Sequence, residues 1–580
     1  MSFFEYFEYN SGKQSIRFGV RNMKRKKMLS LLFSLIFAMA IFAGCSSGNT
    51  GSTNTGGNTA DNGDTGDEVY PRITDNKDVY AQENDSVENL YVTILPDNTA
   101  TMADVDSWTY ETEEVKPELS VRFDYGTPAA DTAGITPNAV LTQRGQSASV
   151  AALKSYKIKL SDSAEKWKGQ KTLNLNKHPY DQTKIRNKLS FDLMKLFGNT
   201  FSLRTQFCRL YIRDLGKGNG YEDYGLFTHV EEPGKNYMEA RGLDKQVYMY
   251  KAQYFQFGTY PDQLRNVDDP GYDKAQFESV LEIEGIEDHE RLIRMLKDAN
   301  DETRDIDDVI ARHFDRDNYI TWLAINILFS NTDTTSKNFL IMSPASSDRW
   351  YFMPWDFDDA LGRYDQVGTM NSWFPQYALE GASNYWEVDF HRRFLMKPQN
   401  VSDLTAKIEE LSRIASREVI AEKVSGYYSA TRALVTSEPD MQVMETSAED
   451  YEAEIKRLPS VLETAKQKYY AGLEKPMPFE LYEVQTGPQF TYTWEASCDL
   501  KGEAIRYDFK LSRTMDFGKV LVEKSDLTGT SLVLDALPAG KYYWKVEAVD
   551  ASGNRQVAYD SAYDEESEEL YFGVRELIVE

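Results

Sequence analysis

The spacing of hydrophobic residues changes along this chain of 580 residues, and the change limits the folds that it can adopt. Up to residue 230 apolar side chains mainly alternate with polar ones, as in the run 155–160, and such alternation predicts strands. From residue 277 to residue 473 they recur at helical spacing, and beyond residue 476 the alternation returns. The sequence therefore predicts an α+β protein with a β-rich lobe, a helical lobe and a final all-β sandwich.

The same patterns give the expected bounds of the elements. In the β-rich part we expect a helix over 181–197 and strands over 90–95, 119–123, 155–160, 208–212 and 224–230. In the helical part we expect helical stretches over 277–299, 305–314, 319–329, 401–428 and 448–473.

The first 45 residues predict an export signal. Positive charges at 23–27 precede an uncharged apolar run, Met28 to Phe42, and small residues come directly before Cys45. The segment resembles a bacterial lipoprotein signal in which the cysteine is lipidated, so we expect an extracellular protein anchored to the outer face of the bacterial cytoplasmic membrane. An ordinary cleaved signal or a membrane anchor is the alternative, but the apolar run is short for a span of about 20 residues.

The chain divides into four expected segments. Residues 1–45 hold the signal, whose expected true start is Met23, and residues 46–70 form a flexible linker without apolar periodicity. Residues 71–475 hold the two lobes, and residues 476–580 hold the sandwich. The sandwich resembles a fibronectin type III domain because its short alternating strands are separated by Gly and Pro turns, and a carbohydrate-binding sandwich is the alternative.

The charge balance narrows the possible partners. The chain has 65 Lys and Arg residues against 92 Asp and Glu residues, a net charge of -27. Nucleic-acid binding depends on clustered cations, so this balance argues against it and favours cations or a basic protein as partners. With 3 cysteines and 5 histidines, a Cys- and His-based zinc site is not expected, and any metal should be a hard cation bound by oxygen atoms.

The most informative segment lies near the middle of the chain. Asn338 follows Asp333 at a distance of five residues, and after a strand-like run at 350–354 comes Trp355-Asp356-Phe357-Asp358. This order matches the catalytic loop and the metal-binding Asp-Phe pair of protein kinases. Phosphoryl transfer needs oxygen ligands for Mg²⁺ and one carboxylate near the acceptor hydroxyl, and these residue types supply both. The first pair alone is common in acidic turns, so the second motif makes the pattern specific.

With these motifs the segment resembles the spore coat protein CotH family of atypical kinases. The family pattern continues with a Gly-Arg pair, found here at 362–363, and it begins upstream with Arg144-Gly145. The run 224–232 also follows in family order. The resemblance covers about residues 88–473 and implies a two-lobed protein-kinase-like fold. It also implies transfer of the γ-phosphate of ATP to Ser or Thr of a surface or coat protein, with Mg²⁺ or Mn²⁺.

The resemblance implies roles for the acidic site residues. Asp333 would be the catalytic base that orients the acceptor hydroxyl, and Asn338 and Asp356 would hold the metal. Asp358 would help to hold a second ion, and a hydrogen bond to local backbone is the alternative.

The phosphates of ATP also require a cation, and the expected place is a strand after Arg144. Lys154 is the first candidate and Lys157 the second, with open solvent as the alternative for each. Arg144 and Glu231 complete the candidates for nucleotide binding, and a turn-stabilising role is the alternative for Arg144. The helix over 181–197 offers Asp192 instead of a glutamate as a partner for the lysine.

Two other classes of function stay open at this stage. One is a non-catalytic cell-surface or cell-wall scaffold, or a polysaccharide-binding protein, because an extracellular location makes the supply of ATP an objection to catalysis. The presence of Asp333, Asn338 and Asp356 together favours catalysis. The other is a glycosidase with paired carboxylates, although no acidic pair lies in a recognisable sugar-cleft pattern.

Overall fold

The computed structural model describes residues 72–110, 115–128, 134–218, 220–365, 375–443, 447–567 and 569–580. The predicted signal, its Cys45 and the linker over 46–70 lie outside these residues. In the described part no helix is both long enough and apolar enough to cross a membrane.

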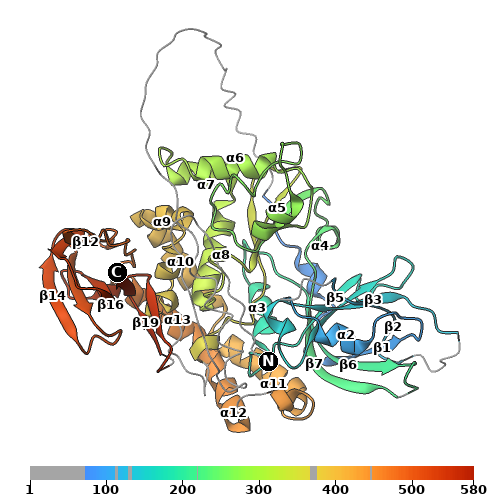
Figure 1. Cartoon of the computed structure of the whole chain (residues 1–580). Helices are drawn as coiled ribbons and strands as arrows, with labels where there is room; N and C mark the ends of the chain where they lie inside the picture. The colour runs from blue at the N-terminus through green and yellow to red at the C-terminus, as the bar shows by residue number, and fades with distance from the viewer. Residues whose placement is uncertain are drawn as a thin grey trace, which may run out of the picture. The chain divides into compact units, whose positions relative to one another are not determined.

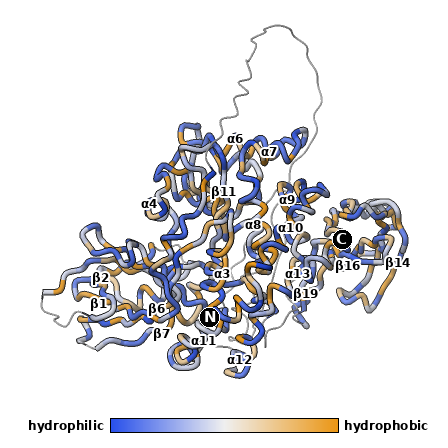
Figure 2. The backbone as a smooth tube through the Cα atoms, turned by 180° about the vertical axis from the view of Figure 1, so that it is seen from behind, coloured by the Kyte–Doolittle hydropathy of each residue, from blue (hydrophilic) through white to orange (hydrophobic). Residues whose placement is uncertain are grey.

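The first seven strands close into a barrel, drawn in blue to green in Figure 1. Its strands follow the order β1-β2-β3-β4-β5-β7-β6, and parallel pairing of β1 with β6 closes the ring. The bounds are β1 (Val87–Ile94), β2 (Glu118–Tyr125), β3 (Ala139–Arg144), β4 (Ser155–Leu160), β5 (Thr172–Asn176), β6 (Thr205–Asp214) and β7 (Glu222–Val230). Hydrophobic and hydrophilic colours alternate along these strands in Figure 2, because one face of each strand is buried in the barrel.

All five strands predicted in this part are confirmed, whereas β3 and β5 lie in stretches for which no strand was predicted. The predicted helix over 181–197 is shorter in the structure, as α3 (Arg186–Met194). Every residue of α3 is buried, including its polar ones, so the helix lies inside the protein and not on its surface.

A second sheet follows the barrel, with the strand order β11-β10-β8-β9. Its strands are β8 (Val247–Ala252), β9 (Leu281–Ile283), β10 (Phe339–Pro344) and β11 (Tyr351–Pro354). Besides α3, the described residues form the α-helices α2 (Met102–Ser107), α4 (Lys235–Ala240), α5 (Lys274–Val280), α6 (Glu290–Ala299), α7 (Ile306–His313), α8 (Arg316–Leu328), α9 (Asp389–Leu395), α10 (Pro398–Ile414), α11 (Arg417–Val435), α12 (Ala448–Arg457) and α13 (Val461–Gly472).

Three of the predicted helical stretches are each divided in two by the structure. The stretch over 277–299 contains β9 between α5 and α6, because this segment pairs with β8. The stretch over 401–428 breaks where the Ser416 side chain caps the start of α11, and Pro459 lies at the break in the stretch over 448–473. Helical spacing is confirmed, but tertiary pairing and capping decide the ends.

Helix α8 forms the centre of the helical part. Every residue from Asn318 to Leu328 is buried, which explains why the sequence is apolar all round the helix instead of on one face. Trp322 stacks on Phe352 of β11 with ring centroids 4.6 Å apart, so the helix packs directly against the second sheet. The carboxyl end of α8 is thereby held close to the ends of β10 and β11.

The C-terminal strands form one five-stranded sheet, β14-β13-β16-β17 with β20 beside β16, and two two-stranded sheets, β12-β15 and β18-β19. The strands are β12 (Gln489–Thr493), β13 (Arg506–Ser512), β14 (Val520–Leu527), β15 (Ser531–Asp535), β16 (Gly540–Val549), β17 (Arg555–Val557), β18 (Ser561–Asp564), β19 (Glu569–Phe572) and β20 (Val574–Val579). A core of aromatic and aliphatic side chains lies between them, with Trp494, Phe509 and Trp544 fully buried or nearly so. The predicted fold class is confirmed: a β-rich part, a helical part and then β-sheets.

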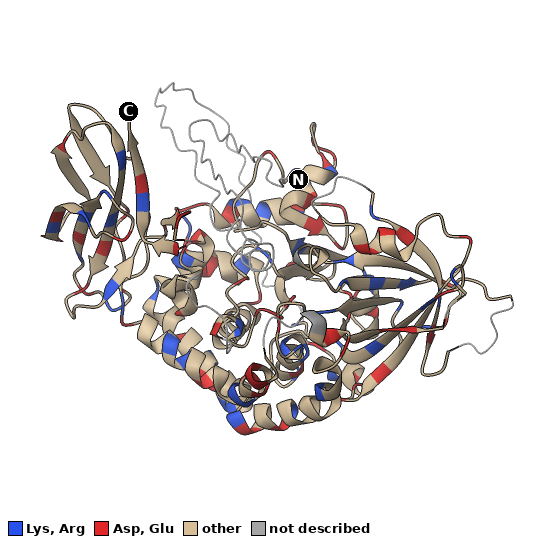
Figure 3. Ribbon diagram, turned by 60° about the horizontal axis from the view of Figure 1, so that its bottom comes forward, with Lys and Arg blue, Asp and Glu red and all other residues tan. Residues whose placement is uncertain are grey.

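Charged residues of both signs are interspersed along the barrel strands and the helices in Figure 3. One group of them is completely buried: Arg186 of α3 binds Asp181 before the helix and Glu454 of α12, and all three side chains have 0% exposure. Because Arg186 neutralises two buried carboxylates, it joins α3 to the C-terminal helices.

We predict that Arg186→Met destabilises the protein by about 3–5 kcal/mol, because it leaves the buried carboxylate of Asp181 without its ion-pair partner and leaves Glu454 with Arg457 alone. The measurement is the urea midpoint, followed by circular dichroism. Arg417→Met at an exposed arginine is the matched control and should leave the midpoint unchanged. Equal midpoints for both variants and the wild type would contradict the prediction.

Candidate active site

The two motifs of the sequence meet at one end of the β10–β11 hairpin. Phe339 pairs with Pro354 in the antiparallel register, so Asn338, directly before β10, and Asp356, two residues after the end of β11, lie at the same end. Both have left-handed backbones, with φ 60° at Asn338 and φ 54° at Asp356. Residues without glycine's freedom adopt this conformation at a cost, and such strain is concentrated at functional sites.

Asp333 lies in the loop that follows α8 and points to the same place. The side-chain amide of Asn338 donates a hydrogen bond of 2.8 Å to Asp333 Oδ2, and Lys337 Nζ lies 3.1 Å from Asp333 Oδ1. Burial raises the pKa of Asp333 to about 6; Lys337 opposes the shift, and the charges of Asp359 and Asp356 add to it. The loop therefore presents one carboxylate that an amide and an ammonium group hold in place.

Asp356 and Asp358 form a half-buried acidic pair beside this loop. Burial and the neighbouring carboxylate of Asp358 together raise the pKa of Asp356 to about 7. Asp358 Oδ2 lies 3.2 Å from His178 Nδ1. Burial lowers the pKa of that imidazole to about 4, so it is neutral at pH 7. A bound cation would relieve the cost of ionising this pair.

Phe357, between the two carboxylates, anchors the motif in the core. Its ring packs edge-on against Phe191 of α3 and Phe329 at the end of α8, with centroid distances of 5.8 Å and 6.2 Å. The side-chain oxygen of Asn187 also accepts a hydrogen bond of 3.4 Å from the Phe357 backbone. Buried contacts with two helices therefore determine where Asp356 and Asp358 lie.

The barrel contributes cations to the same site. Arg144 at the end of β3 is attracted by Glu232, Asp356 and Asp358. Yet within the described part of the chain its guanidinium makes no hydrogen bond or ion pair. Burial lowers the pKa of Arg144, and these carboxylates oppose that shift. Arg144 is half-buried, and its guanidinium lies 6.0 Å from the centre of the Trp355 ring. A guanidinium has five donors, so one without an ion pair offers a place for an anion.

Lys157 of β4 lies on the same side of the barrel and is partly neutralised. Its Nζ lies 2.5 Å from Glu232 Oε1, and Asn174 of β5 donates to the other oxygen of Glu232. Lys157 faces Asn174 across the β4–β5 register. Glu232 lies two residues after the end of β7. It is attracted by both Lys157 and Arg144, so the two cations share this carboxylate as a neighbour.

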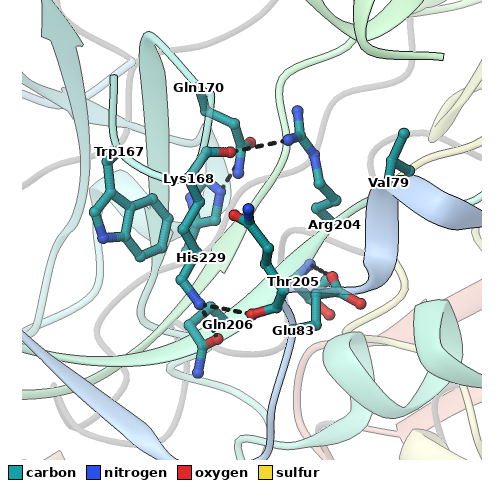
Figure 4. A pocket seen from close by; sticks show the side chains of 10 residues that line it. Val79, Glu83, Trp167, Lys168, Gln170, Arg204, Thr205, Gln206 and His229 are labelled. Carbon is teal, nitrogen blue, oxygen red and sulfur yellow. Dashed lines mark hydrogen bonds between the residues drawn. The ribbon is translucent and has the colours of Figure 1, made fainter. Parts of the chain in front are cut away.

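A cavity of about 310 Å³ lies next to Glu232. Its lining includes the segment after β7, from Glu231 to Tyr237, and the end of β9, from Ile283 to Gly285. The volume falls within the range of small-molecule sites. A second cavity, shown in Figure 4, has only about 10 Å³ and is surrounded by polar side chains that include Gln170, Arg204 and His229. It is too small for more than a water molecule.

Comparison with known proteins identifies the family. The model of the family described as CotH kinase protein matches residues 141–469, which is more than half of the chain. The chain belongs to the CotH kinase protein family. The predicted resemblance is therefore confirmed, and Asp333, Asn338, Asp356 and Asp358 all lie within the matched residues.

A curated relative agrees with this family. Inner spore coat protein H of Bacillus subtilis (strain 168) is 24% identical over 216 residues, which are 36% of this chain and 55% of that protein. This chain thus spans about half the length of that CotH relative.

Three solved structures are also similar to parts of the chain. The proinflammatory kinase CtkA of Helicobacter pylori covers 55% of this chain and 94% of its own, with 9% identity and a TM-score of 0.25. The toxin–antitoxin complex of HipA, HipB and operator DNA from Shewanella oneidensis MR-1 covers 60% and 66%, with 11% identity and a TM-score of 0.23. An Fn3-like protein from Clostridium thermocellum covers 14% and 80%, with 24% identity and a TM-score of 0.11.

In this CotH-family chain, Lys154 and Glu231, two of the predicted nucleotide-binding residues, are bonded to other groups of the protein. Lys154 donates a hydrogen bond of 2.6 Å to the backbone oxygen of Ser149 and is attracted by Asp106. Glu231 is buried between Arg204 and Arg241, although it also lines the larger cavity. The contacts of Lys157 place it near Arg144 and therefore favour it over Lys154, whose role stays a prediction.

Several residues of the site were not predicted. Lys337 stands inside the Asp333 to Asn338 run, so its position in the sequence could have drawn attention to it. Glu232 takes the place that the sequence suggested for Asp192, since Asp192 instead pairs with Lys188 and Lys195. Glu232 ends the run 224–232 that follows in family order, but its contact with Lys157 was not predicted because it joins residues that lie far apart in the chain.

We predict a pH-dependent contribution to stability from Glu284, which lines the larger cavity. Burial and repulsion by Glu282 and Glu232 raise its pKa to about 7, above the value of about 4.3 for an unperturbed glutamate. Ionised Glu284 therefore destabilises the fold, and its contribution is lost progressively as the pH rises through about 4.3 to 7.

The measurement is the urea midpoint of the wild type and of Glu284→Gln at pH 5 and pH 8. The variant should gain stability relative to the wild type at pH 8 and show little difference at pH 5. Glu302→Gln, at an exposed glutamate, is the control and should not change the pH dependence. A difference between Glu284→Gln and wild type that is equal at both pH values would contradict the assignment.

Proposed function

We propose that this protein is an atypical protein kinase that transfers the γ-phosphate of ATP to Ser or Thr of a surface or coat protein. The observation that carries the proposal is the guanidinium of Arg144, which has no ion pair among the described residues and is attracted by the half-buried carboxylates of Asp356 and Asp358. A nucleotide phosphate with its metal ion would pair with both at once, since it carries anionic oxygens and a divalent cation.

The residues fit the nucleotide and metal of this reaction. The nucleoside would occupy the cavity beside Glu232, and the phosphates would lie against Arg144 and Lys157. Among the described residues no three His, Cys, Asp or Glu side chains converge to hold a metal ion by themselves. Mg²⁺ is commonly bound by one or two carboxylates together with phosphates and water, and Asp356 with Asn338 would supply the protein ligands. The bound ion, Mg²⁺ or Mn²⁺, neutralises the charge of the phosphates.

Asp333 would act on the acceptor. Its carboxylate would accept a hydrogen bond from the Ser or Thr hydroxyl and take its proton as the bond to phosphorus forms and the bond to the ADP oxygen breaks. Lys337 and Asn338 hold that carboxylate in one orientation. Both therefore act as positioning residues for Asp333, in addition to any contact of Asn338 with metal.

The acceptor and the location of the protein are part of the proposal. The excess of 92 acidic over 65 basic residues supports a basic acceptor protein. Export and lipid attachment at Cys45 are proposed from the sequence pattern of the first 45 residues. They would place the protein at the outside of the cytoplasmic membrane.

We predict that Asp333→Ala and Asp356→Ala each lower phosphate transfer at least about 100-fold, the lower end of what positioned acid–base groups contribute. The measurement is incorporation from labelled ATP into casein or into the protein itself, with Mn²⁺ present. Asp308→Ala, at an exposed aspartate, is the control and should keep wild-type activity.

Nucleotide binding distinguishes the two variants. Asp333→Ala should keep the Mn²⁺- and ATP-dependent rise in melting temperature, whereas Asp356→Ala should lose it. A wild-type protein with neither phosphate incorporation nor an ATP-dependent shift would support a non-catalytic scaffold instead.

We predict that Lys157→Met weakens ATP binding about tenfold, the effect of losing one charge-assisted hydrogen bond. Lys154→Met is the matched comparison, because Lys154 already bonds to the backbone at Ser149. Isothermal titration calorimetry with ATP and Mn²⁺ measures both. A larger loss for Lys154→Met than for Lys157→Met would reverse the assignment of the phosphate-binding lysine.

A further inference from the structure

Lys116 lies just before β2, on the face of the barrel that carries Arg144 and Lys157. In the β2–β3 register Glu118 faces Thr142, and the same register continued by two residues sets Lys116 opposite Arg144. Thr142 in turn faces Lys157 of β4. Because side chains alternate between the two faces of a sheet, Lys116, Arg144 and Lys157 share one face.

Lys116 is a half-buried cation without a carboxylate partner. Its Nζ lies 4.4 Å from the centre of the Trp108 ring, and it forms no ion pair with any acidic residue that the structure describes. Burial lowers the pKa of Lys116, and the like charges of Lys157 and Arg144 lower it further. Of these cations only Lys157 has a carboxylate within ion-pair distance among the described residues.

Cations that are held together on one face repel each other, and an anion among them removes the cost. Glu232 already neutralises Lys157, so Arg144 and Lys116 are left to meet an incoming anion. Trp108 packs against the ammonium group of Lys116, which limits where that group can go. The arrangement is therefore suited to a ligand with several negative charges.

We propose that Lys116 binds the phosphate chain of the nucleotide as a third cation beside Arg144 and Lys157. This inference rests on the proposed kinase function and adds a residue that the family match does not assign, because that match begins at residue 141. The segment before β2 is thereby part of the nucleotide site. Contacts from three neighbouring strands would then hold the phosphates opposite Asp356.

The test uses the full chain with Lys116→Met, which keeps an apolar stem over Trp108 but removes the charge. Calorimetry with ATP and Mn²⁺ should show about tenfold weaker binding. Lys116→Arg should restore most of the affinity, because the arginine keeps the positive charge. Lys159→Met is the matched control, since Lys159 is an exposed lysine two residues beyond Lys157 on β4, and it should bind ATP like the wild type.

Ligands without the nucleotide's phosphates separate a binding role from a structural one. Lys116→Met should leave the thermal shift with adenosine unchanged, while the shift with ATP becomes smaller. Unchanged ATP affinity, or equal losses for adenosine and ATP, would overturn the inference. If Lys116→Met bound inorganic phosphate more weakly but bound ATP like the wild type, the inference would also be overturned, because Lys116 would then bind a free anion and not the nucleotide.

The outcome for the wild type separates this inference from the proposed function. If the wild type binds ATP and transfers phosphate while Lys116→Met behaves identically, only the role of Lys116 is overturned. If the wild type binds no ATP in the presence of Mn²⁺, both the kinase function and the role of Lys116 are overturned.

Discussion

The packing of Phe357 against Phe191 and Phe329 is the contact on which the site depends. It joins the Asp356-to-Asp358 motif to α3 next to the barrel and to the end of α8 in the helical part. Because the ring is buried, the carboxylates on either side of it are held at the end of the β10–β11 hairpin. The same end carries Asn338, which bonds to Asp333. A change in this packing would therefore move every acidic group of the site.

Charge is divided across the site in a way that suits a metal-bound polyanion. The helical part contributes half-buried carboxylates whose ionisation is costly because they lie close together and partly out of water, and the barrel contributes cations that are incompletely paired. Each group by itself is unfavourable, and a nucleotide with its metal ion would neutralise both. The cost of burying unpaired charge in the free protein would thus be recovered on binding, which ties the stability of the site to its proposed ligand.

Parts of the site could be predicted from local sequence. The Asp333 to Asn338 spacing and the Trp355-to-Asp358 motif lie within one short segment, so their order alone indicated a shared site. The cations could not be assigned with the same accuracy. Lys154 and Lys157 are three residues apart on similar sequence, and only the pairing of β4 with β5 shows that Lys157 meets Glu232. The predicted helical stretch over 277–299 was also wrong in part because of strand pairing. Its middle forms β9, which pairs with β8 although the local spacing of apolar residues is helical.

The sequence by itself determined the order of β-rich, helical and sandwich parts and the CotH-family motif, because hydrophobic period and short motifs are local properties of the chain. Only the tertiary structure decided the closure of the barrel through parallel pairing of β1 with β6. It also decided which cations face the acidic pair and that Arg144 is without an ion pair in the described part. These features depend on contacts between distant segments, and such contacts leave no regular pattern in a single sequence.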